Sequence, residues 1–477
     1  EMCIRDSADY VPQHGENIEF ATNANNNGSP AVRDLYLDTD RVIGDLINNS
    51  DMDLLVTTEN QLTINGVVRD DNPDKGTIVV KTSTDKPTGT LLFANPDDNR
   101  NVNATVEFYN KAYECSTCGF YKNQWQYFGI PVQASGFPYL TPKVETINQW
   151  VEPFSGNKWQ PAPYTPDTGL KAFKGYEMTN SSNTLPTHIY SFPGTLNVGN
   201  AVVPLTRTSN VNYSGMNLVG NSFTAAIPIT STAIELGSVE LTENTVYLFN
   251  TGTRDQWRKL NGGTVSGVAG GQYQAVPFNL AGQAGIPDRI LSMHTFLLDV
   301  KTPGNMTLKY GELIKNELNT STTKPWKSAY TESRTPQYPY IVMDVVSDTS
   351  ADRVWLFENS NTTKGFDNGW DAYKLQEEGL TQVYVSDEAE SRYQIATVPE
   401  FTGTTFGVNT VKEEKFSITL SVTSDVEMRK LYLHDIHTGR SYPIGNNVEY
   451  TFSGANTIAN GRFKIAESSS PLTGTGH

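Results

Sequence analysis

The sequence predicts an all-β protein of tandem β-sandwich domains, similar to immunoglobulin or jelly-roll sandwiches. Apolar and polar residues alternate clearly in three segments, 76–81 (Gly-Thr-Ile-Val-Val-Lys), 103–109 and 415–422. Because successive side chains leave opposite faces of a strand, this period of two is what a half-buried strand requires. Turns rich in Asn, Asp, Gly and Thr separate such runs, and no long helical stretch interrupts them.

Length and charge limit the possible functions. The 477 residues exceed what one hydrophobic core usually organises, so we expect roughly two to four domains. The chain carries 36 basic and 52 acidic residues without a basic block, which argues against nucleic acid and anionic lipid as partners. No apolar run is long enough to span a bilayer, so we predict no transmembrane segment.

The first 33 residues are expected to form an extended N-terminal arm. Residues 1–7 (Glu-Met-Cys-Ile-Arg-Asp-Ser) look foreign to the rest of the chain and are similar to translated sequencing-adapter debris, so no structural role is assigned to them. No signal peptide is visible, although the true start is uncertain and this absence carries little weight. The arm is either loose or laid on the sheet edge of a neighbour.

Residues 34–113 are predicted to form a domain of short strands. The strands expected at 62–64, 77–80, 90–93 and 104–108 follow one another at intervals of roughly fourteen residues. This spacing is typical either of a short solenoid-like ladder or of an ordinary meander.

The remaining chain divides by composition. The segment 114–312 is Gly-rich and aromatic and should be the largest β-sandwich, and 313–337 has the polar composition of a linker. A C-terminal β-sandwich is predicted at 338–466, followed by a tail at 467–477.

The cysteines predict a local disulfide. Cys3 lies in the foreign-looking stretch, and Cys115 and Cys118 form a Cys-x-x-Cys pair. A zinc site would need two further ligands, and no second such pair or cluster of histidines supplies them. We favour a disulfide that closes a small loop in an oxidising compartment, with zinc and unpaired thiols as alternatives.

Acidic turns are weak candidates for structural Ca²⁺, which prefers several oxygen ligands. Apart from this ion we expect no cofactor, and ordinary solvated turns are the favoured interpretation. The candidates are Asp38, Asp40, Asp51, Asp53, Asp70, Asp71, Asp74, Asp367 and Asp371.

Three motifs resemble a known family. They are Trp-Gln-Tyr-Phe-Gly-Ile-Pro-Val at 125–132, Gly-Met-Asn-Leu-Val-Gly-Asn-Ser-Phe at 215–223, and Thr-Lys-Gly-Phe-Asp-Asn-Gly-Trp-Asp-Ala-Tyr-Lys at 363–374. Large secreted surface proteins of Bacteroidota that are exported by the type IX secretion system have W-x-x-x-G-x-P, N-L-V-G-N-P-Y and G-F-D-x-x-x-D-A-x-K in this order. The likeness covers most of residues 100–465.

The chain departs from this family in two places. Ser222 stands where the family usually has Pro, and the C-terminal sorting domain is absent after Ile465. Since that domain is removed on export, the chain is similar to a mature or truncated form. The resemblance implies β-sandwiches, an extracellular location and an adhesive or structural role, and it brings no catalytic residues.

The same motifs can be interpreted as folding signals. Gly129 before Pro131 should end a strand, and Gly220-Asn221 should supply left-handed backbone conformations. Asp367 and Asp371 are expected to fix a turn by accepting backbone N–H bonds, with Phe366 and Trp370 packed beneath it.

No catalytic residues stand out, and we predict that the chain is not an enzyme. Carboxylates within one tight turn, such as Asp367 and Asp371, rarely span the sugar cleft of a glycosidase. His434 and His437 should point to opposite faces of a strand, so they cannot easily share a metal. No Gly-x-Ser-x-Gly elbow is present.

Trp150 and Trp159 are the best candidates for stacking on sugars, because they lie in a polar, turn-rich segment. The alternative, which we favour, is that such large rings fill a thin sandwich core.

We therefore expect an extracellular structural or adhesive protein of the bacterial cell surface. Copies of it would assemble into a filament or surface layer through sheet edges or the terminal arm. A carbohydrate-binding surface protein that captures glycans is the second hypothesis, and a secreted hydrolase is a distant third. Host or cell-surface components are further candidate partners.

Overall fold

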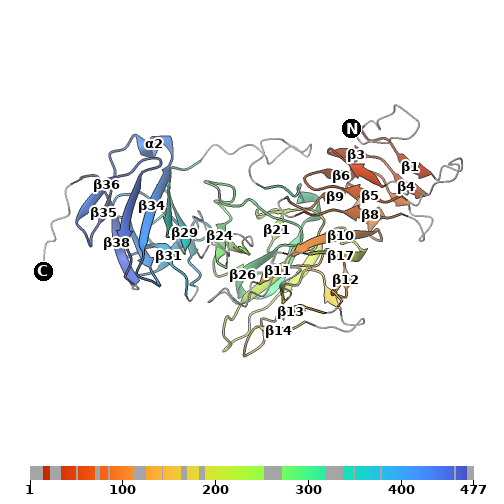
Figure 1. The fold of residues 1–477 in the computed structure, drawn as a ribbon, viewed down its shortest axis with the longest axis horizontal. Coiled ribbons are helices and arrows are strands. Elements are labelled where there is room, and N and C mark those ends of the chain that lie inside the picture. Colours follow the sequence, from red (N-terminus) through yellow and green to blue (C-terminus); the bar gives the residue numbers. More distant parts are fainter. Residues whose placement is uncertain are drawn as a thin grey trace. The chain divides into compact units, whose positions relative to one another are not determined.

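The computed structural model describes residues 14–21, 34–49, 52–69, 76–83, 86–110, 125–141, 143–162, 169–181, 188–251, 271–318, 337–347, 350–376, 379–455 and 458–469. Strands make up nearly all regular structure in these ranges (Figure 1). The helical elements among them are one turn each, namely η1 (Pro96–Asn99), η3 (Tyr310–Glu312) and α2 (Ser424–Glu427). The predicted all-β class is confirmed.

The described residues form two compact units. The first contains those up to 242 together with 288–318, and the second contains 243–251, 271–287 and 337–469. Most of the predicted linker and nearly all of the predicted tail lie outside the described residues. The boundaries proposed at 113, 312 and 338 stay predictions.

The first unit begins with a three-faced parallel solenoid (Figure 1). One face pairs β1 (Ile18–Ala21), β4 (Leu46–Asn49) and β7 (Val68–Arg69) in parallel. The second face pairs β2 (Leu35–Leu37), β5 (Leu54–Val56), β8 (Ile78–Val80) and β10 (Asn103–Asn110). The third face pairs β3 (Arg41–Ile43), β6 (Gln61–Ile64) and β9 (Thr90–Phe93).

Parallel pairing confirms the solenoid and shows that the meander is wrong. Strands that follow one another along the chain belong to different faces, so the interval of fourteen residues is not the repeat. Leu35 pairs with Leu54, and Leu54 pairs with Ile78, so one rung takes roughly twenty to twenty-five residues. The buried side chains of the strands stack inside as a continuous apolar core.

Asn and Asp side chains stabilise the corners of the solenoid. At such a corner the chain leaves one face, and a side-chain oxygen accepts the N–H of another rung. These bonds satisfy backbone donors that the parallel ladders leave free. They run from Asp45 N to Asn17 Oδ1 (2.7 Å), Val67 N to Asp45 Oδ1 (2.9 Å), Gln61 N to Asp40 Oδ1 (2.8 Å), Thr77 N to Asp53 Oδ1 (2.7 Å) and Val68 N to Asn99 Oδ1 (2.9 Å).

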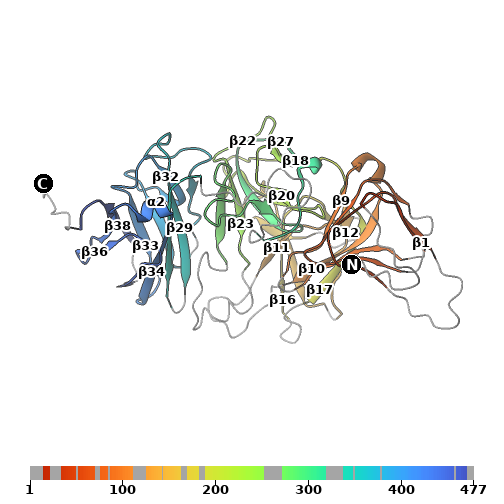
Figure 2. The same ribbon diagram turned by 90° about the horizontal axis from the view of Figure 1, so that it is seen from above.

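An antiparallel strand follows the last rung of the second face. β17 (His188–Thr195) pairs along the whole of β10, with Val106 opposite Phe192, and the two lie side by side in both views (Figures 1 and 2). Beyond it, one four-stranded sheet has the order β11 (Gln126–Phe128), β16 (Tyr176–Asn180), β13 (Glu145–Trp150) and β14 (Trp159–Pro161).

Smaller sheets complete the first unit. Their strands are β12 (Ala134–Ser135) with β15 (Leu170–Lys171), β18 (Ala201–Leu205) with β27 (Gly304–Leu308) and β21 (Ile234–Glu235), β19 (Met216–Gly220) with β26 (Thr295–Thr302) and β22 (Glu240–Leu241), and β20 (Ile227–Pro228) with β25 (Arg289–Ile290).

The glycines of the first two motifs pack against each other. A Cβ on Gly220 would lie 2.6 Å from the Cα of Gly129 and 2.6 Å from the carbonyl oxygen of Lys174. Neither Gly220 nor Asn221 adopts a positive φ, so the predicted left-handed conformation is wrong. Gly220 is required by close backbone approach, while Asn221 donates its side-chain amide to the carbonyls of Ala225 and Ile290.

The second unit contains one long sheet and the hairpin of β23 (Thr245–Phe249) and β24 (Tyr273–Pro277). The sheet runs β36 (Arg440–Pro443), β35 (Tyr432–Asp435), β38 (Ile458–Ala466), β33 (Thr405–Asn409), β31 (Gln382–Ser386), β32 (Arg392–Val398), β29 (Ala351–Glu358), β28 (Tyr340–Val346), β34 (Lys415–Val422) and β37 (Glu449–Ser453), with β30 (Ala372–Tyr373) beside β32.

This sheet curls around its own core. Met343, Val354 and Leu356 are fully buried in it. The two edge strands approach each other, because the rings of Tyr442 on β36 and Tyr450 on β37 stack with centroids 3.9 Å apart. The result is a nearly closed, barrel-like sandwich (Figure 2).

Candidate functional site

The two tryptophans singled out by the sequence lie together. Trp150 on β13 pairs in register with Trp159 on β14, and their rings meet edge to face with centroids 5.2 Å apart. Tyr127 lies 4.9 Å from Trp159, and Tyr213 lies 6.3 Å from Trp150, both measured between ring centroids. We call these four residues the aromatic cluster. Sequence reasoning missed both tyrosines, since no local pattern links them to the hairpin.

The aromatic cluster lies on the less buried face of its sheet. Across the strands, Tyr127 pairs with Glu177 and Glu177 with Asn148, while Trp150 follows two residues later on the same face. The opposite face carries Phe128 and Ile147, which are fully buried. Trp150 and Trp159 are half-buried, so they are not the core of this sheet.

A carboxyl–amide pair lies on the same face as the rings. Glu177 is 6% exposed, and the side-chain amide of Asn148 donates to its Oε1 at 2.8 Å. Burial raises the pKa of Glu177 to about 7, although the bond from Asn148 acts in the opposite direction. Near neutral pH this carboxyl can therefore either donate or accept a hydrogen bond.

Glu152 organises the loop that carries Tyr213. This carboxylate is 4% exposed and accepts the N–H groups of Thr208 and Gly215, each at 2.9 Å. It also accepts the hydroxyls of Thr206 (2.9 Å) and Thr208 (3.0 Å). Burial alone would raise the pKa of Glu152, but these bonds outweigh burial and the pKa lies below its ordinary value.

The hairpin between β13 and β14 is also held from inside. The buried ammonium of Lys158 donates to the carbonyls of Glu152 and Phe154, and the indole N–H of Trp150 donates to the carbonyl of Met216 at 2.7 Å. The bonds of Glu152 and Trp150 thus join the hairpin to the loop. Tyr213 projects from this support with 68% of its surface exposed and with a φ of +51°.

Asp367 and Asp371 fix a turn, as the third motif predicts. Asp367 accepts the N–H of Thr363 at 2.6 Å, and Asp371 accepts those of Asp367 and Thr397, both at 2.6 Å. Burial raises the pKa of Asp371 to about 7. Rings pack at this turn, as expected, because Phe366 stacks on Tyr373 at 4.9 Å and Trp370 meets Tyr338 edge to face at 5.1 Å.

The remaining calcium candidates have diverse surroundings. Asp40 caps a solenoid corner and forms an ion pair with Lys315 (2.7 Å), Asp53 caps another corner, and Asp38 is exposed. Within the described residues, no three His, Cys, Asp or Glu side chains converge as a metal site would require. Structural calcium stays a prediction.

Several predicted site residues fall outside the described residues. These are Asp51, Asp70, Asp71 and Asp74 among the calcium candidates, and the proposed disulfide pair Cys115 and Cys118.

Lys374, the last residue of the third motif, forms a fully buried ion pair that sequence reasoning missed. Its ammonium lies 2.6 Å from Oδ2 of Asp352, and the exposed fractions of the two side chains are 1% and 0%. The N–H of Val383 also donates to Asp352 at 2.8 Å. Burial raises the pKa of Asp352 and lowers that of Lys374, while the attraction between their charges opposes both shifts.

The two neighbouring histidines differ in environment. His434 is buried, with Nδ1 2.6 Å from the hydroxyl of Ser441 and Nε2 2.8 Å from the carbonyl of Ser468. His437 lies in an exposed turn after β35. Both ring nitrogens of His434 are occupied by partners that link β35 to β36 and to the segment after β38, which is a structural arrangement.

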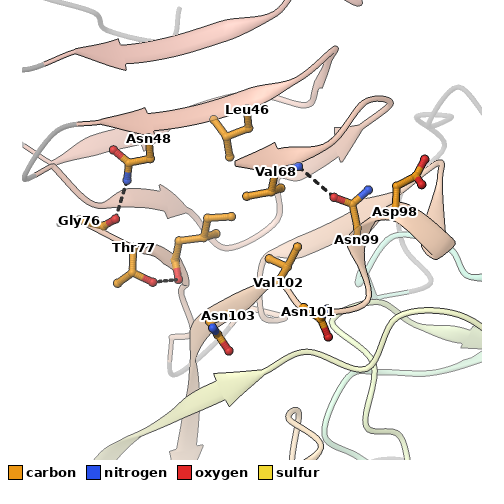
Figure 3. A pocket seen from close by; sticks show the side chains of 11 residues that line it. Leu46, Asn48, Val68, Gly76, Thr77, Asp98, Asn99, Asn101, Val102 and Asn103 are labelled. Atoms are coloured by element: carbon orange, nitrogen blue, oxygen red, sulfur yellow. Dashed lines mark hydrogen bonds between the residues drawn. The ribbon is translucent and has the colours of Figure 1, made fainter. Parts of the chain in front are cut away.

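A cavity of about 310 Å³ lies at the solenoid, between the strand faces that carry Leu46, Val68 and Ile78 (Figure 3). Asn48 and Asn99 point toward backbone groups at its wall, and both are already bonded. Asn48 donates to the carbonyl of Gly76 at 2.6 Å, and Asn99 accepts the N–H of Val68 at 2.9 Å. These amides are corner supports of the solenoid.

One curated protein of similar sequence is the minor fimbrium subunit Mfa5 of Porphyromonas gingivalis. The chain is 50% identical to it over 465 residues, which are 96% of this chain and 37% of that protein. The chain therefore spans little more than a third of the length of this relative. No family model matches the sequence. No solved structure matches it either.

These findings bear on where the chain acts. Similarity to a fimbrium subunit of a Bacteroidota species confirms the predicted extracellular location at the cell surface. Among the described residues there is no helix with the length and apolarity to cross a bilayer.

Proposed function

We propose that this chain is a structural, non-enzymatic part of a cell-surface fimbria, in which it associates with copies of itself or with other subunits. The similarity to a minor fimbrium subunit over almost the whole chain is the observation that carries this proposal. Export by the type IX secretion system stays part of the proposal, and the three motifs are its support.

The strand edges of the solenoid suggest how subunits associate. Among the described strands, β1, β2 and β3 each have a partner on one side only. Such edges accept an added strand through main-chain hydrogen bonds. On β2 the N–H of Leu35 donates inward to the carbonyl of Asp53, so the N–H and carbonyl of Tyr36 point to the other side.

The fimbrial role can be tested on sheared surface fibres. We expect the protein to co-purify with the fimbrial fraction and to be visible on fibres by immunogold electron microscopy. If the protein were absent from that fraction and found only as soluble secreted chain, the proposal would be wrong.

Strand addition at β2 can be tested with Tyr36→Pro. Proline removes the outward N–H and leaves the inner ladder of β2 unchanged, so self-association measured by light scattering should fall while thermal stability is retained. Tyr36→Thr is the matched control, because it removes the ring and keeps the N–H. Equal loss in both variants would assign the association to the ring instead.

A further inference from the structure

We propose that the aromatic cluster is a binding site for a neutral glycan, with Tyr213 and Trp159 stacking on the apolar faces of pyranose rings. The inference concerns a ligand site and does not depend on the fimbrial role. Its basis is the meeting of two half-buried tryptophans, an exposed tyrosine and a buried carboxyl–amide pair.

The loop geometry indicates that the exposed side chain of Tyr213 is held in a fixed position by its surroundings. A bulky residue at φ +51° is strained, because its Cβ crowds the backbone, and strain of this kind persists only where the surroundings impose it. Here the surroundings are the four bonds to Glu152 together with the bond from Ser214 Oγ to the carbonyl of Thr208 (2.6 Å). A pre-formed aromatic surface loses little entropy on binding.

The polar surroundings favour an uncharged ligand. The exposed residues in 153–157 and 209–213 are Pro, Phe, Ser, Gly, Asn and Tyr, and none is charged. Arg207 is engaged with the carbonyl of Val300 at 2.7 Å. Side-chain amides and hydroxyls next to aromatic rings suit a pyranose, which has one apolar face and a rim of hydroxyl groups.

A peptide partner fits this surface less well. Peptides add strands at sheet edges or bury apolar side chains in grooves. The rings here meet edge to face at interplanar angles of 78° and 60°, so they form a set of separate ring faces and edges. Separate aromatic faces of this kind can each stack on one of several successive sugar rings.

The test uses the full chain and an immobilised panel of short linear oligosaccharides of glucose, mannose, galactose or N-acetylglucosamine, with sialylated and sulfated glycans and a peptide library as further arms. We expect at least one neutral oligosaccharide to bind. Its affinity should not change between low and high salt, because no charge is paired in the complex.

Tyr213→Gly is the decisive variant. Glycine adopts a positive φ without strain, so the thermal midpoint should stay the same or rise, while affinity for the bound oligosaccharide should fall at least about tenfold. Asn447→Gly is the matched control, since Asn447 has a φ of +55° in an exposed turn of the second unit and is not part of the aromatic cluster or its loop, and it should bind normally. Trp159→Ala should also weaken binding.

Three results would overturn the inference. The first is that no neutral oligosaccharide binds. The second is that Tyr213→Gly and Asn447→Gly bind equally well. The third is that binding is confined to acidic glycans or to peptides.

Discussion

Buried ionic side chains in this protein are held by specific partners. Lys374 pairs with Asp352 in the second unit, while in the first unit Glu152 accepts four bonds and Lys158 donates to two carbonyls. A buried charge is tolerated only when such bonds replace its hydration. The partners of Lys374 and Glu152 do not follow from sequence spacing, because they come from other strands and turns, whereas Lys158 bonds two carbonyls within its own hairpin.

Lys374→Met should strongly destabilise the second unit. The substitution leaves the fully buried Asp352 without its counter-ion, and breaking such a pair costs about 3–5 kcal/mol. Thermal unfolding followed by circular dichroism would measure the change.

The double variant Lys374→Met/Asp352→Leu should recover much of this loss, because no charge is then buried alone. Lys364→Met is the control, since Lys364 and Glu400 form an exposed pair at 3.4 Å and its loss should change stability little. Equal effects of Lys364→Met and Lys374→Met would contradict the expectation.

The free energy of unfolding of the first unit should fall as pH rises, because the buried carboxyl of Glu177 then loses its proton. Burial raises its pKa from 4.5 to about 7, so the folded chain binds this proton more tightly than the unfolded chain. The stabilisation is fully present below about pH 4.5 and is lost as pH rises through about 7, a change on the order of 3 kcal/mol.

Glu177→Gln should flatten this part of the pH profile in chemical unfolding. Asp371 contributes a fall of the same sign in the second unit, so part of the slope should remain in the variant. Glu240→Gln is the control, because it removes an exposed carboxyl of the first unit instead of a buried one. An unaltered slope in Glu177→Gln would show that this carboxyl does not titrate as described.

At the scale of elements, strands could be predicted from alternation, but their partners could not. The segments 103–109 and 415–422, which show a period of two, form β10 and β34. Whether short strands pair as a meander or as rungs depends on residues some twenty positions apart, which local periodicity does not reach. The role of Gly220 was missed for the same reason, since its neighbour is Gly129.

Gly76→Ala should disrupt the solenoid. A Cβ at this position would overlap the backbone carbonyl of Met52 on the adjacent rung, so the rungs must separate, at a cost of about 1–3 kcal/mol. Gly136→Ala is the matched control, because no atom lies within 4 Å of its Cβ position and its φ is not positive. Chemical unfolding should give a lower denaturant midpoint for Gly76→Ala than for Gly136→Ala. Equal midpoints would contradict the close packing of the rungs.

At the scale of the whole molecule, alternation predicted the all-β class and the resemblance of the three motifs implied the extracellular location, whereas the contacts between distant residues could not be predicted. The Trp150 and Trp159 pair could be proposed because both lie in one polar hairpin. Tyr127 and Tyr213 could not, because only the folded sheet and the Glu152 loop bring them near.

Net charge should control association between copies. Each chain carries a formal charge of −16, so like-charge repulsion opposes assembly at low ionic strength. If the copies associate, light scattering should show more association when salt is raised to shorten the screening length. Association that weakens with added salt would point to pairing of opposite charges across the interface.

The conformation of Tyr213 also has an evolutionary consequence. At a left-handed backbone position, substitution by glycine or asparagine relieves the crowding at no cost to folding, so such substitutions should be tolerated and accumulate. An unused ring would be lost quickly among descendants of this gene. If related strains keep an aromatic residue at this position, selection for contact with a ligand would explain it.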